Sequence, residues 1–208
     1  MRSSTISNIS QPLAEVIAMA SRRVIEQPQV GASESHLSRL SAAGVPRRYA
    51  EAVAHRWRRT KATDEVQAFL SDRERSILLL YGGPGSGKTC AAVWPLRAER
   101  FPGYYVIAPE VGQAYRSLDY RERVDAWTSF RLLVIDELGR EPTDRNEQSR
   151  VTVWEVIEKR YAAMRKTILC TNVRLDLLWD RYDAHLRDRI EGDRGVVVLT
   201  GASLRGAP

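Results

Sequence analysis

The sequence predicts an α/β protein in which a parallel sheet of five strands lies between two layers of helices, with a short helical segment in front of it. Beyond residue 62, short apolar runs alternate with helical patterns, which is typical of such sheets. Several runs are apolar on both faces, as expected of strands that helices cover on each side. The expected strands are 76–82, 104–108, 131–137, 167–172 and 196–201.

Turn and capping residues give the expected helix limits. Gly44 is a stop signal, Thr63 is a candidate N-cap, and Val151 falls on the apolar side of its helix. The expected helices are 12–27, 33–43, 46–57, 63–75, 145–164 and 175–191, and a further helix is expected after Gly87.

The composition excludes several classes of protein. No apolar run approaches the ~20 residues that span a bilayer, and the first residues lack the apolar stretch of a signal peptide. We therefore expect no membrane association and a cytoplasmic location. Cys90 and Cys170 are isolated from each other, and the three histidines show no ligand spacing, so a zinc site or a disulfide framework is not expected.

The positive charge is concentrated at the start of the chain. Residues 1–62 contain ten Arg or Lys and four Asp or Glu, whereas residues 63–208 contain 22 of each kind. Such a basic segment indicates nucleic acid or an acidic protein surface as partner. The alternative is a general preference for arginine, which supplies 28 of the 32 basic residues. Further candidates for a DNA-facing surface are Arg116, Arg121 and Arg123, although acidic residues lie between them.

A complete Walker A motif, G-x-x-x-x-G-K-T, lies between an expected strand and an expected helix. Its glycines let the backbone wrap around phosphate groups that a Cβ atom would block. Lys88 is expected to reach the β- and γ-phosphates of ATP, and the Thr89 hydroxyl to ligate Mg²⁺. A glycine-rich turn without a ligand is the weaker interpretation, because strand, loop and helix are all in place. The expected nucleotide-binding residues are Gly82, Gly83, Pro84, Gly85, Ser86, Gly87, Lys88 and Thr89.

A Walker B segment follows about fifty residues later, where the apolar run 132–135 ends in two acids. Ligands of open α/β sheets bind at the carboxyl ends of the strands. Asp136 is expected to hold Mg²⁺ through water, and Glu137 to polarise the attacking water. Two acids at the end of a strand also fit a strand end that is merely solvated. The assignment as Walker B therefore depends on the distance in sequence from the Walker A motif.

Asn172 ends the next apolar run and can face the γ-phosphate from between the other two strands. Its amide can both donate to phosphate and orient water. A turn asparagine without a ligand is the alternative.

The helix that includes 186–190 offers arginines for the charge that develops on a transferred phosphoryl group. Arg189 is the first choice and Arg187 the second, with an ordinary charged surface helix as the alternative. Arg205, after the last strand, is a further basic candidate near the nucleotide.

Together these motifs resemble the DnaC/IstB-type AAA+ ATPases, which include helicase loaders and transposition helper proteins. The resemblance extends over residues 40–206 and is carried by 42–49, the Walker A loop, 132–139, 154–172, 186–190 and 201–206. It implies a P-loop NTPase of the ASCE class over 63–208, with a three-layer αβα fold and without a full helical lid. Residues 1–62 would form a basic helical segment that contacts DNA or a partner.

The resemblance also implies roles for individual residues. Val45 would help to enclose the adenine, Asn172 would be sensor 1, Arg189 would act as the arginine finger on a neighbouring subunit, and Arg205 would be a sensor-2-like residue. Cys90 is counted with the nucleotide-binding loop, although it begins a Cys-Ala-Ala sequence where the family usually has His-Leu-Ala. Leu204 also departs from the family, in a position where an aromatic residue is common.

The function that these observations favour is ATP binding and hydrolysis by an accessory protein of DNA replication, with ATP and Mg²⁺ as its cofactors. The expected partners are DNA, in single-stranded form, a replicative helicase or a transposase, and further copies of the chain in an ATP-dependent oligomer. An IstB-like transposition helper is the alternative. A small-molecule or nucleotide kinase and a non-hydrolysing binding module are less favoured, because Lys88, Thr89, Asp136 and Glu137 are all present.

Overall fold

Five parallel strands form the sheet that the sequence predicts, in the spatial order β2-β3-β4-β1-β5. The computed structural model describes residues 32–55, 59–99, 102–193 and 195–200. Each strand lies within one or two residues of its expected limits. The strands are β1 (Ile77–Gly82), β2 (Gly103–Ile107), β3 (Leu132–Asp136), β4 (Lys166–Thr171) and β5 (Val196–Leu199).

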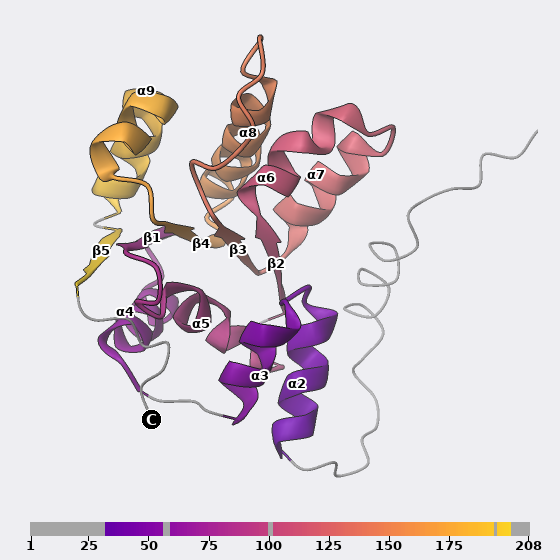
Figure 1. Cartoon of the computed structure of the whole chain (residues 1–208), viewed down its shortest axis with the longest axis vertical. Coiled ribbons are helices and arrows are strands. Elements are labelled where there is room, and N and C mark those ends of the chain that lie inside the picture. Colours follow the sequence, from indigo (N-terminus) through magenta and orange to yellow (C-terminus); the bar gives the residue numbers. More distant parts are fainter. Residues whose placement is uncertain (1–31, 56–58, 100–101, 194, 201–208) are drawn as a thin grey trace, which may run out of the picture.

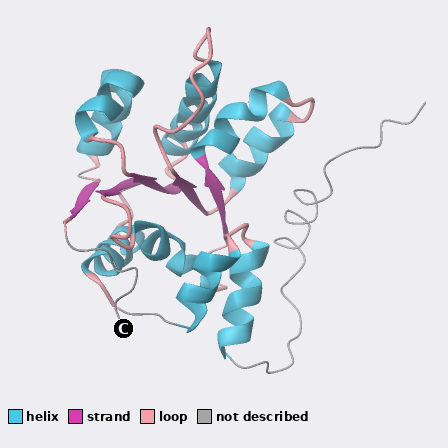
Figure 2. Cartoon of the chain, viewed as in Figure 1, coloured by secondary structure: helices cyan, strands magenta, loops and turns pink. Residues whose placement is uncertain are grey.

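Helices cover both faces of the sheet and complete three layers (Figures 1 and 2). One face packs against α2 (Ala32–Ala42), α3 (Arg47–His55), α4 (Lys61–Ser71), α5 (Lys88–Val93) and the 3₁₀ turn η1 (Trp94–Arg97). The other packs against α6 (Ala108–Gln113), η2 (Ala114–Arg116), α7 (Tyr120–Ser129), α8 (Gln148–Ala162) and α9 (Leu175–Gly192). In the part of the chain that the structure describes, no helix is both long enough and apolar enough to cross a bilayer.

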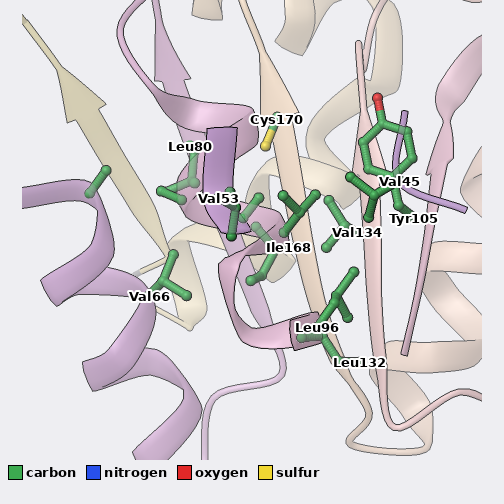
Figure 3. Packing of buried hydrophobic residues seen from close by; sticks show 14 of the residues in the cluster. Val45, Val53, Val66, Leu80, Leu96, Tyr105, Leu132, Val134, Ile168 and Cys170 are labelled. Atoms are coloured by element: carbon green, nitrogen blue, oxygen red, sulfur yellow. The ribbon is translucent and has the colours of Figure 1, made fainter. Parts of the chain in front are cut away.

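The side chains of alternating strand residues belong to two separate apolar cores, one on each face of the sheet. On the side of α2–α5, Leu80, Val134 and Ile168 meet Val53 and Val66 from the helices (Figure 3). The core on the opposite face contains the other strand residues, such as Leu79 and Ile135, and apolar residues of α6–α9. Because strand side chains alternate between faces, a strand covered on both sides must be apolar throughout.

Helices α2 and α3 lie within the basic segment expected over 1–62, and their apolar residues join the same core as the sheet. Leu40, Ala50 and Val53 are almost completely buried there. The division of the chain near residue 62 stays a prediction. The expected helix 12–27 lies outside the described residues.

The helices of the structure differ from the expected ones in several details. Helices α6 and α7 were not expected, α4 ends at Ser71 and not at residue 75, and α8 begins at Gln148 and not at residue 145. Helix α4 begins two residues earlier than expected, with Thr60 as its N-cap and Thr63 as the third residue of a capping box. Both threonines can accept from a backbone amide, and the first of them takes the cap. On α8, Val151 is 43% exposed, whereas Thr152, Val153 and Arg160 are buried. Polar residues therefore replace part of the apolar stripe on the side of α8 that faces the sheet.

Arg160 shows how a charged side chain is accommodated in this core. It is fully buried and donates to the carbonyl oxygens of Trp127 (2.7 Å), Phe130 (2.9 Å) and Lys166 (2.6 Å) and to the hydroxyl of Thr167 (2.9 Å). Burial lowers the pKa of its guanidinium to about 9. The side chain remains charged at neutral pH and joins α8 to the end of α7 and the start of β4.

Candidate functional site

The Walker A loop joins β1 to α5 and owes its shape to glycines. Gly85 and Gly87 have positive φ angles of 83° and 84°, which L side chains rarely adopt. At Gly82 the neighbouring strand sets the limit, because a Cβ atom there would lie 2.6 Å from the carbonyl oxygen of Leu199 on β5. The strand, loop and helix thus follow one another in the order that the motif requires.

Lys88 points back into this loop from the first position of α5. It is buried, and its Nζ donates to the carbonyl oxygens of Gly82 (2.7 Å) and Gly83 (2.9 Å) and to Ser86 Oγ (3.3 Å). The ammonium group therefore lies inside the curve of the loop, where a phosphate would be bound.

Thr89 and Asp136 bring the two motifs together. The Thr89 hydroxyl donates to Asp136 Oδ2 at 2.8 Å, and Asp136 Oδ1 accepts from the backbone amide of Glu137 at 2.9 Å. A hydroxyl and a carboxylate are the hard oxygen ligands that Mg²⁺ prefers. No cluster of three metal-ligating residues occurs among the described residues. The pair thus fits a Mg²⁺ ion that takes its other oxygens from phosphates and water, and not a cage made by the protein alone.

Tyr105 is a further contact of Asp136 that sequence reasoning missed. Its hydroxyl donates to Asp136 Oδ2 at 3.1 Å from β2, the strand next to β3. Burial and the charge of Asp136 hold the pKa of Tyr105 well above its ordinary value, so the phenol remains a hydrogen-bond donor. No motif marks this tyrosine, because the contact exists only once β2 and β3 are paired.

Strand β4 lies between β1 and β3, as the expected position of Asn172 requires. Asn172 follows Thr171, the last residue of β4, and is exposed at the carboxyl edge of the sheet. Its Oδ1 accepts from Arg140 Nε at 3.1 Å. An amide whose oxygen is taken in this way keeps its NH₂ group available for a phosphate or a water molecule.

Glu137 leaves the end of β3 in an unusual backbone conformation. Its φ angle of 57° is left-handed, and the residue is exposed although Asp136 beside it is buried. The turn is held by two backbone hydrogen bonds, from Arg140 N to Glu137 O (3.0 Å) and from Leu138 N to Cys170 O (2.9 Å). The two adjacent carboxylates thus differ in surroundings, as expected if one holds a metal and the other acts on water.

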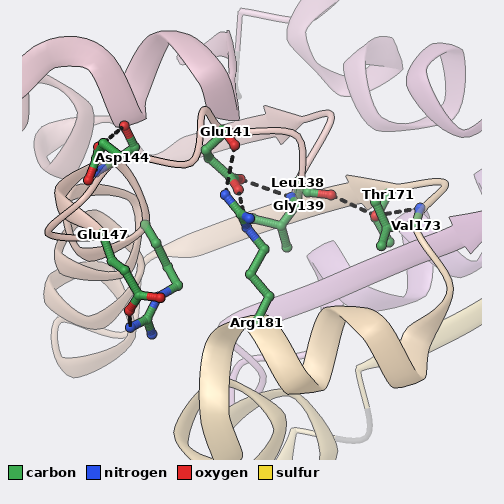
Figure 4. Close-up of polar contacts among 10 residues, drawn as sticks. Leu138, Gly139, Glu141, Asp144, Glu147, Thr171, Val173 and Arg181 are labelled. Atoms are coloured by element: carbon green, nitrogen blue, oxygen red, sulfur yellow. Dashed lines mark hydrogen bonds and ion pairs between the residues drawn. The ribbon is translucent and has the colours of Figure 1, made fainter.

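The loop after Glu137 is attached to α9 by a buried ion pair (Figure 4). Glu141 has a fully buried side chain, with Oε1 accepting from Gly139 N at 2.9 Å and Oε2 from Arg181 Nε at 3.0 Å. A second guanidinium nitrogen of Arg181 donates to the carbonyl oxygen of Glu141 at 2.7 Å. The segment that bears Glu137 is therefore joined to the helix that bears Arg189.

The two candidate finger arginines are both on α9 and are paired within their own chain. Arg189 lies against α8, where it contacts Glu158 at 3.3 Å and its guanidinium lies 4.8 Å from the centre of the Tyr161 ring. Arg187 pairs with Glu191 at 2.8 Å. Neither has a contact with the Walker A loop or with Asp136 among the described residues.

The remaining candidates lie apart from this cluster or outside the description. Val45 is only 4% exposed and packs near Tyr105 in the core (Figure 3). Cys90 is half-buried on α5. Arg205 lies outside the described residues, as does the greater part of the basic segment. The role expected of Val45 at the adenine stays a prediction.

The chain matches the model of a known protein family. Residues 58–205 match the model of a family described as IstB-like ATP binding protein. The match covers well over half of the 208 residues. No curated protein sequence matches the chain.

Solved structures show the same fold at low sequence identity. The DnaC helicase loader has a TM-score of 0.61 and 20% identity, with 74% of this chain and 100% of that chain covered. DnaI has a TM-score of 0.52 and 21% identity, with 69% and 82% covered. AMPPCP-bound DnaA from Aquifex aeolicus has a TM-score of 0.55 and 20% identity, with 65% and 44% covered. The chain therefore spans less than half the length of that DnaA.

Proposed function

The chain belongs to the family of IstB-like ATP binding proteins, and from this premise we propose that it binds ATP with Mg²⁺ and hydrolyses the ATP to ADP and phosphate. The observation that carries the proposal is the 2.8 Å hydrogen bond from the Thr89 hydroxyl to Asp136 Oδ2. Lys88 directly precedes Thr89 in the chain, so the phosphate-binding ammonium group lies close to the oxygen ligands Thr89 and Asp136. The three side chains can therefore bind one metal–nucleotide complex.

Each residue has a distinct part in the proposed reaction. Lys88 exchanges its contacts with backbone carbonyl oxygens for contacts with the β- and γ-phosphates, and Thr89 and Asp136 hold Mg²⁺. Glu137 takes a proton from the water that attacks the γ-phosphorus, while the bond from this phosphorus to the bridging oxygen breaks and ADP leaves. Asn172 orients the water or the γ-phosphate. Mg²⁺, when bound, supplies positive charge against the charge that develops on the phosphates.

The partner that we propose is the machinery of DNA replication, in the manner of a helicase loader acting on single-stranded DNA. The likeness in fold to the DnaC helicase loader, whose solved chain is covered completely, supports this proposal. A transposition helper is the second candidate, and the IstB-like family description supports it. Pull-down with the replicative helicase or with a transposase distinguishes the two.

One of the arginines expected to face DNA is already engaged within the chain. Among the candidate arginines, Arg123 already pairs with Glu110 at 2.9 Å, and its guanidinium lies 5.1 Å from the centre of the Trp127 ring. Its charge is therefore partly engaged within the chain. If DNA binds through other basic side chains, its affinity will fall steeply as the salt concentration rises, because each phosphate contact releases counterions.

We also propose that Arg189 acts on ATP bound by a neighbouring copy of the chain. The support is its position on α9, where it contacts α8 and keeps 33% of its side chain exposed. Assembly then completes the site, because the planar guanidinium stabilises charge on the transferred phosphoryl group.

One experiment tests hydrolysis and assembly together. Glu137→Gln should bind ATP normally and hydrolyse it at least about a hundredfold more slowly, because the general base is lost. Arg189→Ala should also bind ATP but lose turnover. The measurement is phosphate release, with and without single-stranded DNA, alongside nucleotide affinity by calorimetry.

Mixing the two variants then locates the arginine. Interfaces that combine Glu137 of one copy with Arg189 of another are intact in such mixtures, so turnover should return. Unchanged turnover of Glu137→Gln would remove its assigned role. A mixture as inactive as its components would place Arg189 in its own site or in a structural role.

A further inference from the structure

Asp136 is held by three donors, and one of them comes from outside the Walker motifs. Its Oδ2 accepts from Thr89 Oγ1 at 2.8 Å and from Tyr105 Oη at 3.1 Å, while its Oδ1 accepts from Glu137 N at 2.9 Å. Thr89 and Glu137 have parts of their own in the proposed reaction. Tyr105 has none, and among the described residues its hydroxyl makes only this side-chain hydrogen bond.

The pairing of β2 with β3 explains how the phenol reaches the carboxylate. In the parallel register, Tyr105 lies opposite Val134 and Asp136 lies opposite Ile107. All four side chains therefore share one face of the sheet, and the tyrosine ring extends diagonally across two positions to Asp136. A phenylalanine ring would fill the same space and leave the carboxylate oxygen without this donor.

Tyr105 is also fixed at its backbone. Its amide donates to the carbonyl oxygen of Ala43 at 2.8 Å, and a Cβ atom on Gly44 would lie 2.9 Å from the carbonyl oxygen of Tyr105. The side chain is only 6% exposed. One residue thus connects the segment around Val45, expected to help to enclose the adenine, to the carboxylate expected to hold the metal.

We propose that Tyr105 is a positioning residue of the Mg²⁺ site, which holds the Asp136 carboxylate in the orientation that Mg²⁺–ATP requires. The inference rests on the proposed function, since it concerns the same nucleotide. The proposed action of the hydroxyl is through Asp136, and it is assigned no direct contact with the metal or the phosphates. Groups that orient a metal ligand from behind in this way commonly change metal affinity or activity by about 10- to 100-fold when they are removed.

The test is Tyr105→Phe, with Tyr104→Phe as matched control. Tyr104 is the preceding residue of β2, and its ring stacks on Phe130 at a centroid distance of 5.2 Å. Calorimetry measures the affinity for the ATP analogue AMPPCP in the presence of Mg²⁺ and in the presence of EDTA. The ratio of the two affinities reports the metal's contribution separately from the contribution of the nucleotide.

For Tyr105→Phe, this ratio should fall by about tenfold, while affinity in EDTA and the melting temperature stay close to those of the wild type. Tyr104→Phe should keep the wild-type ratio. An unchanged ratio in Tyr105→Phe, or an equal fall in both variants, would overturn the proposal while leaving the ATPase proposal in place. A wild-type chain whose affinity for AMPPCP does not depend on Mg²⁺ would overturn both.

Discussion

Glu137 has a left-handed backbone conformation, which residues other than glycine rarely adopt. A left-handed φ costs about 1–2 kcal/mol for an L-residue, and here the φ angle is 57°. Hydrogen bonds from Leu138 and Arg140 to fixed carbonyl oxygens stabilise the turn. The result is that two consecutive acids point into different surroundings, with Asp136 buried and Glu137 exposed. Strain of this kind is frequent where a chain must present a reactive side chain.

Arg140, in the same turn, yields a prediction at the residue scale. Its Nε donates to Asn172 Oδ1 at 3.1 Å and so fixes which end of the amide is available. Arg140→Ala should lower kcat by roughly tenfold to a hundredfold, because a reacting group that is slightly misplaced slows the reaction. The Kd for AMPPCP should change little. Steady-state kinetics and calorimetry measure the two quantities.

The control for this variant is Arg145→Ala, an exposed arginine further along the same loop. Its kcat should stay at the wild-type value. If Arg140→Ala has the kcat of this control, Arg140 does not orient Asn172 for the reaction.

Individual site residues were predictable from the sequence where a local motif includes them. Lys88 and Thr89 follow from eight consecutive residues, and Asp136 from an apolar strand that ends in acids. Tyr105 was not predictable, because its contact with Asp136 depends on which strand pairs with β3 and in which register. The same holds for Arg140, whose contact with Asn172 depends on the pairing of β3 with β4.

At the scale of elements, the loop after β3 is coupled to α9 by the pair of Glu141 and Arg181. The Glu141 side chain is fully buried and that of Arg181 is 24% exposed. Arg181→Met should therefore lower the free energy of unfolding by about 3 kcal/mol, because it leaves a carboxylate buried without its cation. Urea unfolding measures the loss.

Arg187→Met provides the comparison, since Arg187 forms an i,i+4 pair on the same helix with both side chains more than half exposed. Such exposed pairs contribute about 0–1 kcal/mol. Equal losses in the two variants would show that the buried pair does not hold the loop to α9.

Most elements were predictable to within a few residues, although α6 and α7 were not expected, and the errors have physical causes. The apolar periodicity locates α8, but it placed Val151 in the core because an apolar residue is not always the one that faces inward. Buried Arg160 and Thr152 occupy that side of α8 because they find hydrogen-bond partners there. For α4, Thr60 and Thr63 are both possible caps, and the sequence alone does not rank them.

For the whole molecule, the alternation of strands and helices was enough to predict a parallel sheet. It does not specify the strand order, in which β4 separates β1 from β3 and brings Asn172 between the two motifs. Composition also did not show that apolar residues of α2 and α3, which lie in the basic first third of the chain, belong to the core on one face of the sheet. These features depend on contacts between residues far apart in the chain, which no local pattern records.

The central claim is that Lys88, Thr89 and Asp136 bind one Mg²⁺–ATP complex at the carboxyl edge of the sheet. The most direct measurement is a crystal structure of the chain grown with Mg²⁺ and AMPPCP. We predict that Lys88 Nζ leaves the carbonyl oxygens of Gly82 and Gly83 for the phosphates, and that the metal lies beside Thr89 Oγ1 and Asp136. A nucleotide bound elsewhere, or a metal remote from both side chains, would contradict the account.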